Sequence, residues 1–189
     1  MSVAASKLKS KKWKRVCGKE EVVFQLMDPS DEMSLRSAIE GFAGTLPASD
    51  LVFLRMDITQ PEAVDEWVEN VKRGRTLTLL AKLQGEIVGY ANLHMSSLQW
   101  TSHIGEIRIL VSSKHRAHGI GKELINDMLD VAEEKELERA VIHVPATQPR
   151  VRMMIESAGF EPEALLTDWL KDHNGQVHDL IIMSRLIGD

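Results

Sequence analysis

Residue types and segments that mark secreted, membrane-spanning or thiol-dependent proteins are scarce in this sequence. The 189 residues include one cysteine, Cys17, so an internal disulfide is excluded and too few thiols are present for a zinc–thiolate site. No apolar run reaches the roughly 18 residues that a membrane-spanning helix needs, and no apolar signal-peptide segment is found. The patterns G-x-S-x-G and H-E-x-x-H are also absent. We therefore expect a cytoplasmic protein that neither enters a membrane nor binds a metal.

Charge is distributed unevenly along the chain. Residues 1–20 contain seven Lys or Arg and one acid, for a net charge of +6, and because the whole chain carries −5, residues 21–189 carry −11. A basic arm could contact nucleic acid or an acidic partner. However, Trp13 is the only aromatic residue within it, and single-strand binding usually needs a series of stacking rings. We interpret residues 1–20 as a solvated extension of one domain, residues 21–189, whose acidic character disfavours nucleic-acid binding.

Hydrophobic periodicity predicts both strands and helices. The predicted strands cover residues 22–27, 76–83, 87–95, 104–111 and roughly 139–144. One helix is expected to begin with Asp28 as its cap and Pro29 as its first residue, and a second with a capping box formed by Thr59 and Glu62. Two further helices are predicted over roughly 121–135 and 149–158. Residues 51–56 remain open between a short strand and a loop that covers a site.

The helix predicted over residues 121–135 is amphipathic. Its apolar residues recur at helical spacing and are expected to face the core: Leu124, Ile125, Met128, Val131 and Ala132. Its acidic residues are expected to face water: Glu123, Asp127, Asp130, Glu133 and Glu134. We interpret the apolar stripe as core rather than as a binding surface.

A basic, glycine-containing loop joins the predicted strand 104–111 to this helix. Its sequence is Arg116-Ala117-His118-Gly119-Ile120-Gly121. The two glycines allow the backbone to approach an anion closely, and the free N–H groups and dipole of the first helical turn favour that anion. The glycine spacing fits neither a P-loop, G-x-x-x-x-G-K-[ST], nor a dinucleotide fingerprint, G-x-G-x-x-G. The loop therefore predicts a phosphate site of another class, with a glycine turn that binds nothing as the alternative.

The spacing that is present, R-x-x-G-x-G, resembles the pyrophosphate-binding motif of the GCN5-related N-acetyltransferases, the GNAT superfamily. The strand that ends at Val111, the helix, strand and short helix after it, and the closing Gly159-Phe160 follow the order typical of that family. Residues 168–183 also match a tail pattern of many members, D-x-x-x-D-x-x-G-x-x-x-D-L-x-x-M. The resemblance covers roughly residues 21 to 187. It implies an α/β (α+β) fold with a mixed, mostly antiparallel sheet, helices on both faces, and two splayed strands that bind acyl-CoA.

The resemblance also implies acetyl-CoA as co-substrate and a set of residues that hold it. The loop would take the pyrophosphate, and the main chain of the preceding strand would pair with the pantetheine arm. A backbone N–H near Leu110 would polarise the thioester carbonyl. The residues assigned to acetyl-CoA are Leu110, Val111, Arg116, Ala117, His118, Gly119, Ile120, Gly121, Lys122 and Gln148. In this chain Gln148 replaces an asparagine common in the family, and Ile155 replaces the tyrosine that protonates the leaving thiolate in many members.

An amine acceptor needs a base, because amines with pKa values of about 8 to 10.4 are mostly protonated at neutral pH. Glu106 lies on the motif strand, near the position where many GNAT enzymes have a catalytic glutamate. His143 lies on the next strand, where protein N-terminal acetyltransferases of the family have a glutamate base, and an imidazole is suited to taking a proton near neutral pH. Alternatively, Glu106 simply pairs with Arg108, and His143 is a satisfied, half-buried histidine.

Together these features predict an N-acetyltransferase that transfers the acetyl group of acetyl-CoA to a primary amine of a small-molecule or amino-acid-like acceptor by direct attack. Because Ile155 replaces the tyrosine, a non-catalytic acyl-CoA-binding regulator is one alternative. A protein N-acetyltransferase whose basic arm docks its target is another. Trp67, Trp100 and Trp169 could line the acceptor pocket. A homodimer would be in keeping with the resemblance, since many GNAT proteins dimerise.

Overall fold

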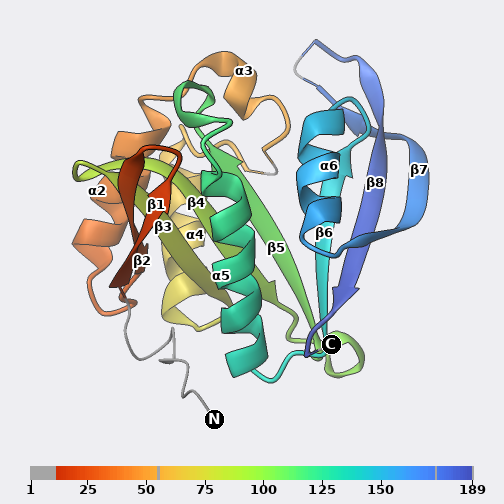
Figure 1. Ribbon diagram of the computed structural model, residues 1–189, viewed down its shortest axis with the longest axis horizontal. Helices are drawn as coiled ribbons and strands as arrows, with labels where there is room; N and C mark the ends of the chain where they lie inside the picture. Colours follow the sequence, from red (N-terminus) through yellow and green to blue (C-terminus); the bar gives the residue numbers. More distant parts are fainter. Residues whose placement is uncertain (1–11, 55, 173, 189) are drawn as a thin grey trace.

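A single mixed sheet organises the protein. The computed structural model describes residues 12–54, 56–172 and 174–188. Within them, eight strands follow the order β1-β2-β3-β4-β5-β6-β8-β7 (Figure 1). The strands are β1 (Lys12–Cys17), β2 (Glu20–Leu26), β3 (Thr76–Leu83), β4 (Glu86–Met95), β5 (Ile104–Val111), β6 (Arg139–Pro145), β7 (Glu161–Lys171) and β8 (Val177–Leu186). All neighbouring pairs are antiparallel except β5 and β6, which are parallel. The mostly antiparallel sheet expected from the sequence is confirmed.

Helices cover both faces of the sheet. They are α2 (Glu32–Ala43), α3 (Ala48–Leu51), α4 (Pro61–Lys72), α5 (Ile120–Glu134) and α6 (Pro149–Ser157), with short 3-10 turns at Gln99–Thr101 and Ser113–His115. The apolar sides of α2 and α4 pack with Leu80, Tyr90 and Leu110 in one core cluster. The stripe of α5 packs with strand residues of the opposite face in a second cluster, so the sheet lies between two helical layers (Figure 1). No helix of the described residues is long and apolar enough to cross a membrane.

The strand, loop and helix around the glycine motif form as predicted. β5 has the bounds read from the sequence, and α5 begins at Ile120, so the last two residues of the motif already belong to the helix. All five apolar residues of the predicted α5 stripe are buried. The tail residues form an antiparallel β7–β8 hairpin. Local periodicity was sufficient here because each element buries one regular face.

The starts of two helices differ from the prediction. α2 begins at Glu32, and its cap is Asp31, whose side chain accepts a hydrogen bond from the Ser34 N–H at 3.1 Å. Asp28 instead accepts the N–H of Ser30 in a turn before the helix. The predicted capping box at α4 is wrong as well: the cap residue is Gln60, and the hydroxyl of Thr59 donates to Asp57 rather than capping the helix. In both cases a short-range aspartate turn competes with the cap.

Strand β1 corrects two expectations, one about the amino-terminal residues and one about Asp127 of α5. Residues 12–17, expected in a solvated extension, form β1, which pairs with β2 along its whole length. The first eleven residues lie outside the described residues. Asp127, expected to face water on α5, is fully buried because residues of β1 lie against it. The indole N–H of Trp13 donates to the Asp127 carboxylate at 2.6 Å, and the guanidinium of Arg15 donates to the same carboxylate at 2.9 Å.

Candidate active site

The two strands β5 and β6 separate along their length. They are paired from Ile104, opposite Arg139, to Glu106, opposite Val141, and no pairing continues beyond that point in the described residues. β6 then pairs with β8, and β5 continues alongside β4. Figure 1 shows the resulting divergence between the two ribbons. This is the splay that the family resemblance implies.

The register with β4 decides which backbone groups of β5 face this splay. In an antiparallel ladder every second residue directs its N–H and C=O to the partner strand. The N–H of Ser112 donates to Val88 at 2.9 Å, and Leu110 lies opposite Tyr90, so Leu110 belongs to the set that bonds β4. The backbone groups of Ile109 and Val111 therefore point toward the splay. This corrects the expectation that Leu110 would offer its main chain there; its side chain is buried in the core instead.

The glycine loop ends in an uncapped helix start. Gly119 precedes α5 in the left-handed region, with φ of +87°, and no side chain caps the helix. The first intrahelical bond runs from the Glu123 N–H to the Gly119 carbonyl. The N–H groups of Ile120, Gly121 and Lys122 consequently have no acceptor within the helix. A Cβ on Gly121 would lie 3.0 Å from the sulfur of Met154, so the backbone of α5 approaches α6 closely. These features form an anion cradle made of main chain.

The basic side chains of the loop are arranged differently from one another. Lys122 is exposed at the start of α5. The ring of His118 lies near its own chain, with Nδ1 3.3 Å from the His115 carbonyl. Arg116 does not extend into the cradle: its guanidinium bonds the buried carboxylate of Asp50 at 2.6 Å and the carbonyl of Val111 at 3.1 Å. Sequence reasoning missed Asp50, because an aspartate in an unassigned segment has no local signal of burial.

A cavity of about 400 Å³ opens on the α4 side of the sheet and reaches the splay. Its walls include Glu106, Ile109 and His143 from the diverging strands, and Gln148 and Ile155 from the α6 region. Of the two alternatives for residues 51–56, a short strand or a loop over the site, the described residues have the loop: α3 ends at Leu51, and Val52, Phe53, Leu54 and Met56 belong to the cavity wall. The cavity therefore extends from the splay between β5 and β6 to the segment after α3.

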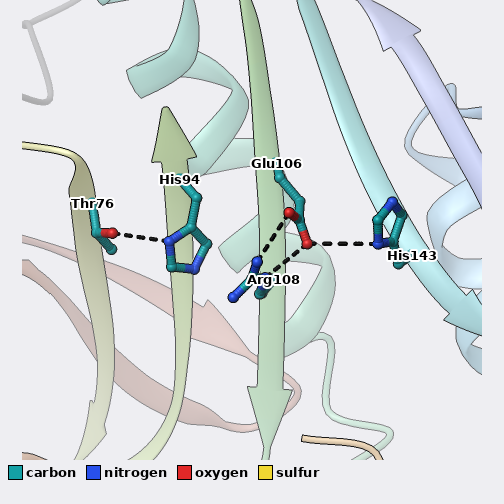
Figure 2. A network of polar contacts seen from close by, with 5 residues as sticks. All are labelled: Thr76, His94, Glu106, Arg108 and His143. Carbon is teal, nitrogen blue, oxygen red and sulfur yellow. Dashed lines mark hydrogen bonds and ion pairs between the residues drawn. The ribbon is translucent and has the colours of Figure 1, made fainter. Parts of the chain in front are cut away.

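Glu106 and His143 lie together in this cavity. Arg108 holds the Glu106 carboxylate with two hydrogen bonds, from Nε at 2.7 Å and from Nη2 at 3.0 Å. The Nδ1 atom of His143 lies 3.7 Å from Oε1 of the same carboxylate. Figure 2 shows the imidazole and the guanidinium on opposite sides of it. Pairing of Glu106 with Arg108, one of the alternatives read from the sequence, is present, and it does not separate Glu106 from His143.

Further polar and aromatic groups line the cavity beside this cluster. Nδ1 of His94 lies 2.9 Å from the hydroxyl of Thr76 (Figure 2). Trp67 and Trp169 are part of the wall, whereas Trp100, also considered for the pocket, is 80 % exposed and lies elsewhere. The wall is mostly apolar with a few polar groups, which is the usual character of a small-molecule site.

Comparison with known proteins agrees with the fold and the motif. A family model described as the acetyltransferase (GNAT) family matches residues 47–160, more than half of the chain. The chain belongs to this family. Membership makes it an acetyl-CoA-dependent N-acetyltransferase. A search of curated proteins found no significant match to this chain.

Solved structures share the GNAT fold at low sequence identity. A ribosomal-protein-alanine N-acetyltransferase from Brucella melitensis has a TM-score of 0.70 at 21 % identity, over 86 % of this chain and 98 % of that one. A GNAT-family acetyltransferase from Streptococcus pneumoniae has a TM-score of 0.71 at 20 % identity, over 88 % and 99 %. A phosphinothricin acetyltransferase from Sinorhizobium meliloti, in complex with acetyl-CoA, has a TM-score of 0.71 at 18 % identity, over 88 % and 89 %. At these identities the likeness establishes the shared fold.

Proposed function

We propose that this GNAT protein transfers the acetyl group of acetyl-CoA to a primary amine of a small-molecule or amino-acid-like acceptor. The observation that carries this proposal is the continuous cavity: its wall includes Ile109 at the splay as well as Glu106 and His143. A volume of about 400 Å³ is in the range of small-molecule sites. The aromatic wall and the few polar groups favour a compact acceptor. A peptide end remains the alternative acceptor, to be compared in the same assay.

The residues of this chain fit acetyl-CoA. The pyrophosphate would accept hydrogen bonds from the first-turn N–H groups of α5, whose dipole favours an anion. The splay-facing main chain of Ile109 and Val111 would bind the pantetheine arm, and Gln148 lies in the wall near its path. When bound, acetyl-CoA supplies an acyl group that is activated as a thioester. The Ile109 N–H, directed into the splay, is the donor that we assign to polarising its carbonyl.

His143 is the base that we assign to the acceptor amine. An ammonium must lose a proton before its nitrogen can attack, and imidazole is the side chain best suited to accept that proton near neutral pH. Glu106 is already held by two charge-assisted hydrogen bonds from Arg108. Its role is therefore to orient the imidazole and to stabilise it once it is charged. Glu106 is a positioning residue in this arrangement, and His143 is the catalytic one.

Loss of the coenzyme thiolate does not depend on a tyrosine at position 155. Ile155 is buried and lies in the cavity wall, so it provides no proton. Tyr90 is also in the wall, packed between Phe42 and Trp67 with ring centroids at 6.0 and 4.8 Å. Burial raises the pKa of Tyr90 well above its ordinary value, so its phenol stays protonated at neutral pH and cannot act as a base. A thiol with an ordinary pKa near 8.5 leaves as a thiolate at moderate cost.

Thermal unfolding with acetyl-CoA tests cofactor binding, with ATP and NAD as controls. A ligand at a hundred times its dissociation constant adds about 2.7 kcal/mol of stability. We expect stabilisation by acetyl-CoA alone. Equal shifts with all three ligands, or none, would contradict the assigned cradle. Turnover is then measured on a panel of primary amines and short peptides. Stabilisation without turnover on any of them would favour the regulator alternative over catalysis, and turnover on peptides alone would favour a protein acceptor.

Substitution of the base tests the mechanism. His143→Gln should lower kcat by about 10² to 10⁴, the usual contribution of general base catalysis, and leave the acetyl-CoA dissociation constant unchanged. Glu106→Gln should lower kcat less and shift the pH–rate profile, because the imidazole loses its carboxylate. His103→Gln is the matched control, since His103 is exposed and outside the cavity wall. Equal kcat values for the His143 and His103 variants would contradict the assignment.

A further inference from the structure

Asp50 is a buried carboxylate that the proposed chemistry does not use. It lies in the single turn of α3, and its side chain is 1 % exposed. Both of its oxygens are engaged: Oδ2 accepts the Ser113 N–H at 2.8 Å, and Oδ1 accepts Arg116 Nη2 at 2.6 Å. These partners are more than sixty residues away in the sequence and belong to the segment that leads from β5 into the glycine loop. A fully buried acid is rarely found without such partners.

One guanidinium extends this contact to the cofactor strand. Nε of Arg116 donates to the carbonyl of Val111 at 3.1 Å while Nη2 bonds Asp50. Val111 is one of the residues whose main chain faces the splay. Asp50 thus determines the direction of Arg116, and Arg116 in turn contacts the end of β5. The planar fork of arginine is needed for this double contact, because an ammonium has no comparable fixed geometry.

The same short segment also forms part of the acceptor space. Val52, Phe53 and Leu54 follow Asp50 after one intervening residue and lie in the cavity wall. The ring of Phe53 stands edge-on to His178 of β8, with centroids 5.4 Å apart, so the segment reaches across to the tail hairpin. A four-residue helix has little stability by itself. Its position therefore depends on contacts such as those of Asp50.

From this arrangement we infer that Asp50 couples the acetyl-CoA loop to the acceptor wall. Occupation of the loop restrains residues 113–116, and through Asp50 the restraint reaches residues 50–54 and orders the wall before the acceptor enters. The coupling is reciprocal, so an acceptor strengthens acetyl-CoA binding by the same factor. Asp50 is a positioning residue that acts through Arg116 and the Ser113 N–H. The inference rests on the proposed function, because it requires acetyl-CoA at the loop.

Amide hydrogen exchange with acetyl-CoA as the probe tests this coupling without any acceptor. In the unmodified protein, acetyl-CoA should slow exchange in residues 120–124 and also, on the order of tenfold, in residues 47–54. In Asp50→Asn, which keeps an oxygen for the Ser113 N–H but loses the charge for Arg116, saturating acetyl-CoA should protect residues 120–124 only. Asp57→Asn is the matched control, because Asp57 is exposed and accepts its hydrogen bonds from Thr59 and Gln60 of its own turn.

The outcomes separate this inference from the proposed function. Protection of 120–124 without protection of 47–54 in the unmodified protein would overturn the coupling and leave acetyl-CoA binding intact. Equal protection of 47–54 in the Asp50 and Asp57 variants would also overturn it. Absence of protection at 120–124 in the unmodified protein would overturn the proposed function and the coupling with it. Arg116→Lys is a second variant, in which one ammonium cannot hold both Asp50 and Val111, and it should lose the protection of 47–54 as well.

Discussion

Replacement of Asp127 tests how much the contacts between β1 and α5 contribute to stability. Asp127 lies in the middle of α5 with no exposed surface. Its Oδ2 accepts the indole N–H of Trp13 at 2.6 Å, and its Oδ1 accepts Arg15 Nη2 at 2.9 Å. The Nε atom of Arg15 also lies 3.0 Å from Glu123, one turn earlier on α5. We expect Asp127→Ala to loosen β1 from α5 and to destabilise the whole domain.

The size of this effect follows from the contacts that are lost. A hydrogen bond to a charged group contributes about 1.5–3 kcal/mol, and breaking a buried ion pair costs about 3–5 kcal/mol. The Arg15 side chain is 41 % exposed and can be rehydrated in the variant, which reduces the cost. Trp13 loses this acceptor for its indole N–H. We therefore expect the free energy of unfolding to fall by about 2–3 kcal/mol.

Urea unfolding, followed by tryptophan fluorescence, measures this change. The midpoint should decrease at a constant slope, which indicates loss of stability rather than a change in the surface exposed on unfolding. Glu133→Ala is the control, since Glu133 is an exposed acid on the same helix. A double-mutant cycle with Arg15→Ala isolates the pair. A loss below about 1 kcal/mol, or one equal to that of the Glu133 variant, would refute the assigned role of the buried carboxylate.

Three further predictions follow from individual contacts. Gly121→Glu should fold, because the atoms nearest to a Cβ at this position belong to the flexible Met154 side chain. Its negative charge at the helix start should abolish the stabilisation by acetyl-CoA, which is about 2.7 kcal/mol at a hundred times the dissociation constant. Normal stabilisation of this variant would contradict the cradle. Gly89→Ala should lower the free energy of unfolding by about 1–3 kcal/mol, because its Cβ would lie 2.7 Å from the carbonyl oxygen of Leu110. Urea unfolding measures this change, and unchanged stability would contradict the close contact between β4 and β5. A hydrogen bond from His178 and two from backbone N–H groups hold the pKa of Asp172 below its ordinary value of about 3.9. This carboxylate therefore stabilises the tail hairpin at any pH above about 3.9, and the stabilisation is lost as the pH falls through the lowered pKa. Relative to the intrinsic exchange rate at each pH, the protection of residues 176–180 should therefore fall below pH 4 in the unmodified protein but not in Asp172→Asn; identical protection profiles would contradict this role.

The strand, loop and helix of the cofactor motif were predictable because their signals are local. Residues 104–111 are mostly apolar, α5 has a complete apolar stripe, and Gly119 takes the left-handed backbone that a glycine before a helix start suggests. The tail segment was recognised from the match of residues 168–183 to the family pattern rather than from a local signal. Local patterns failed where two turns compete for one helix start, as at Asp28 and Asp31.

The candidate site was only partly predictable. Sequence reasoning selected Glu106 and His143 separately, and the structure places them in one cavity, where Arg108 bonds the Glu106 carboxylate on the side opposite His143. It assigned the main-chain role to Leu110 and Val111, and the register corrects Leu110, because a shift of one residue in the β4–β5 pairing exchanges the backbone groups that face the splay. The catalytic roles of Glu106 and His143 remain predictions for the assays above.

The sequence by itself determined the family and, except for α3, the order of the elements from β2 to α6, because the motif and each of these elements depend on residues close together in the chain. Only the tertiary structure decided the fate of three charged side chains. Asp127 is buried beneath Trp13 and Arg15 of β1, which bond its carboxylate. Asp50 is buried because it bonds the segment after β5, and Arg116 turns away from the cradle to meet it. Burial of a charge depends on partners from distant parts of the chain, and no local pattern of hydrophobicity records them.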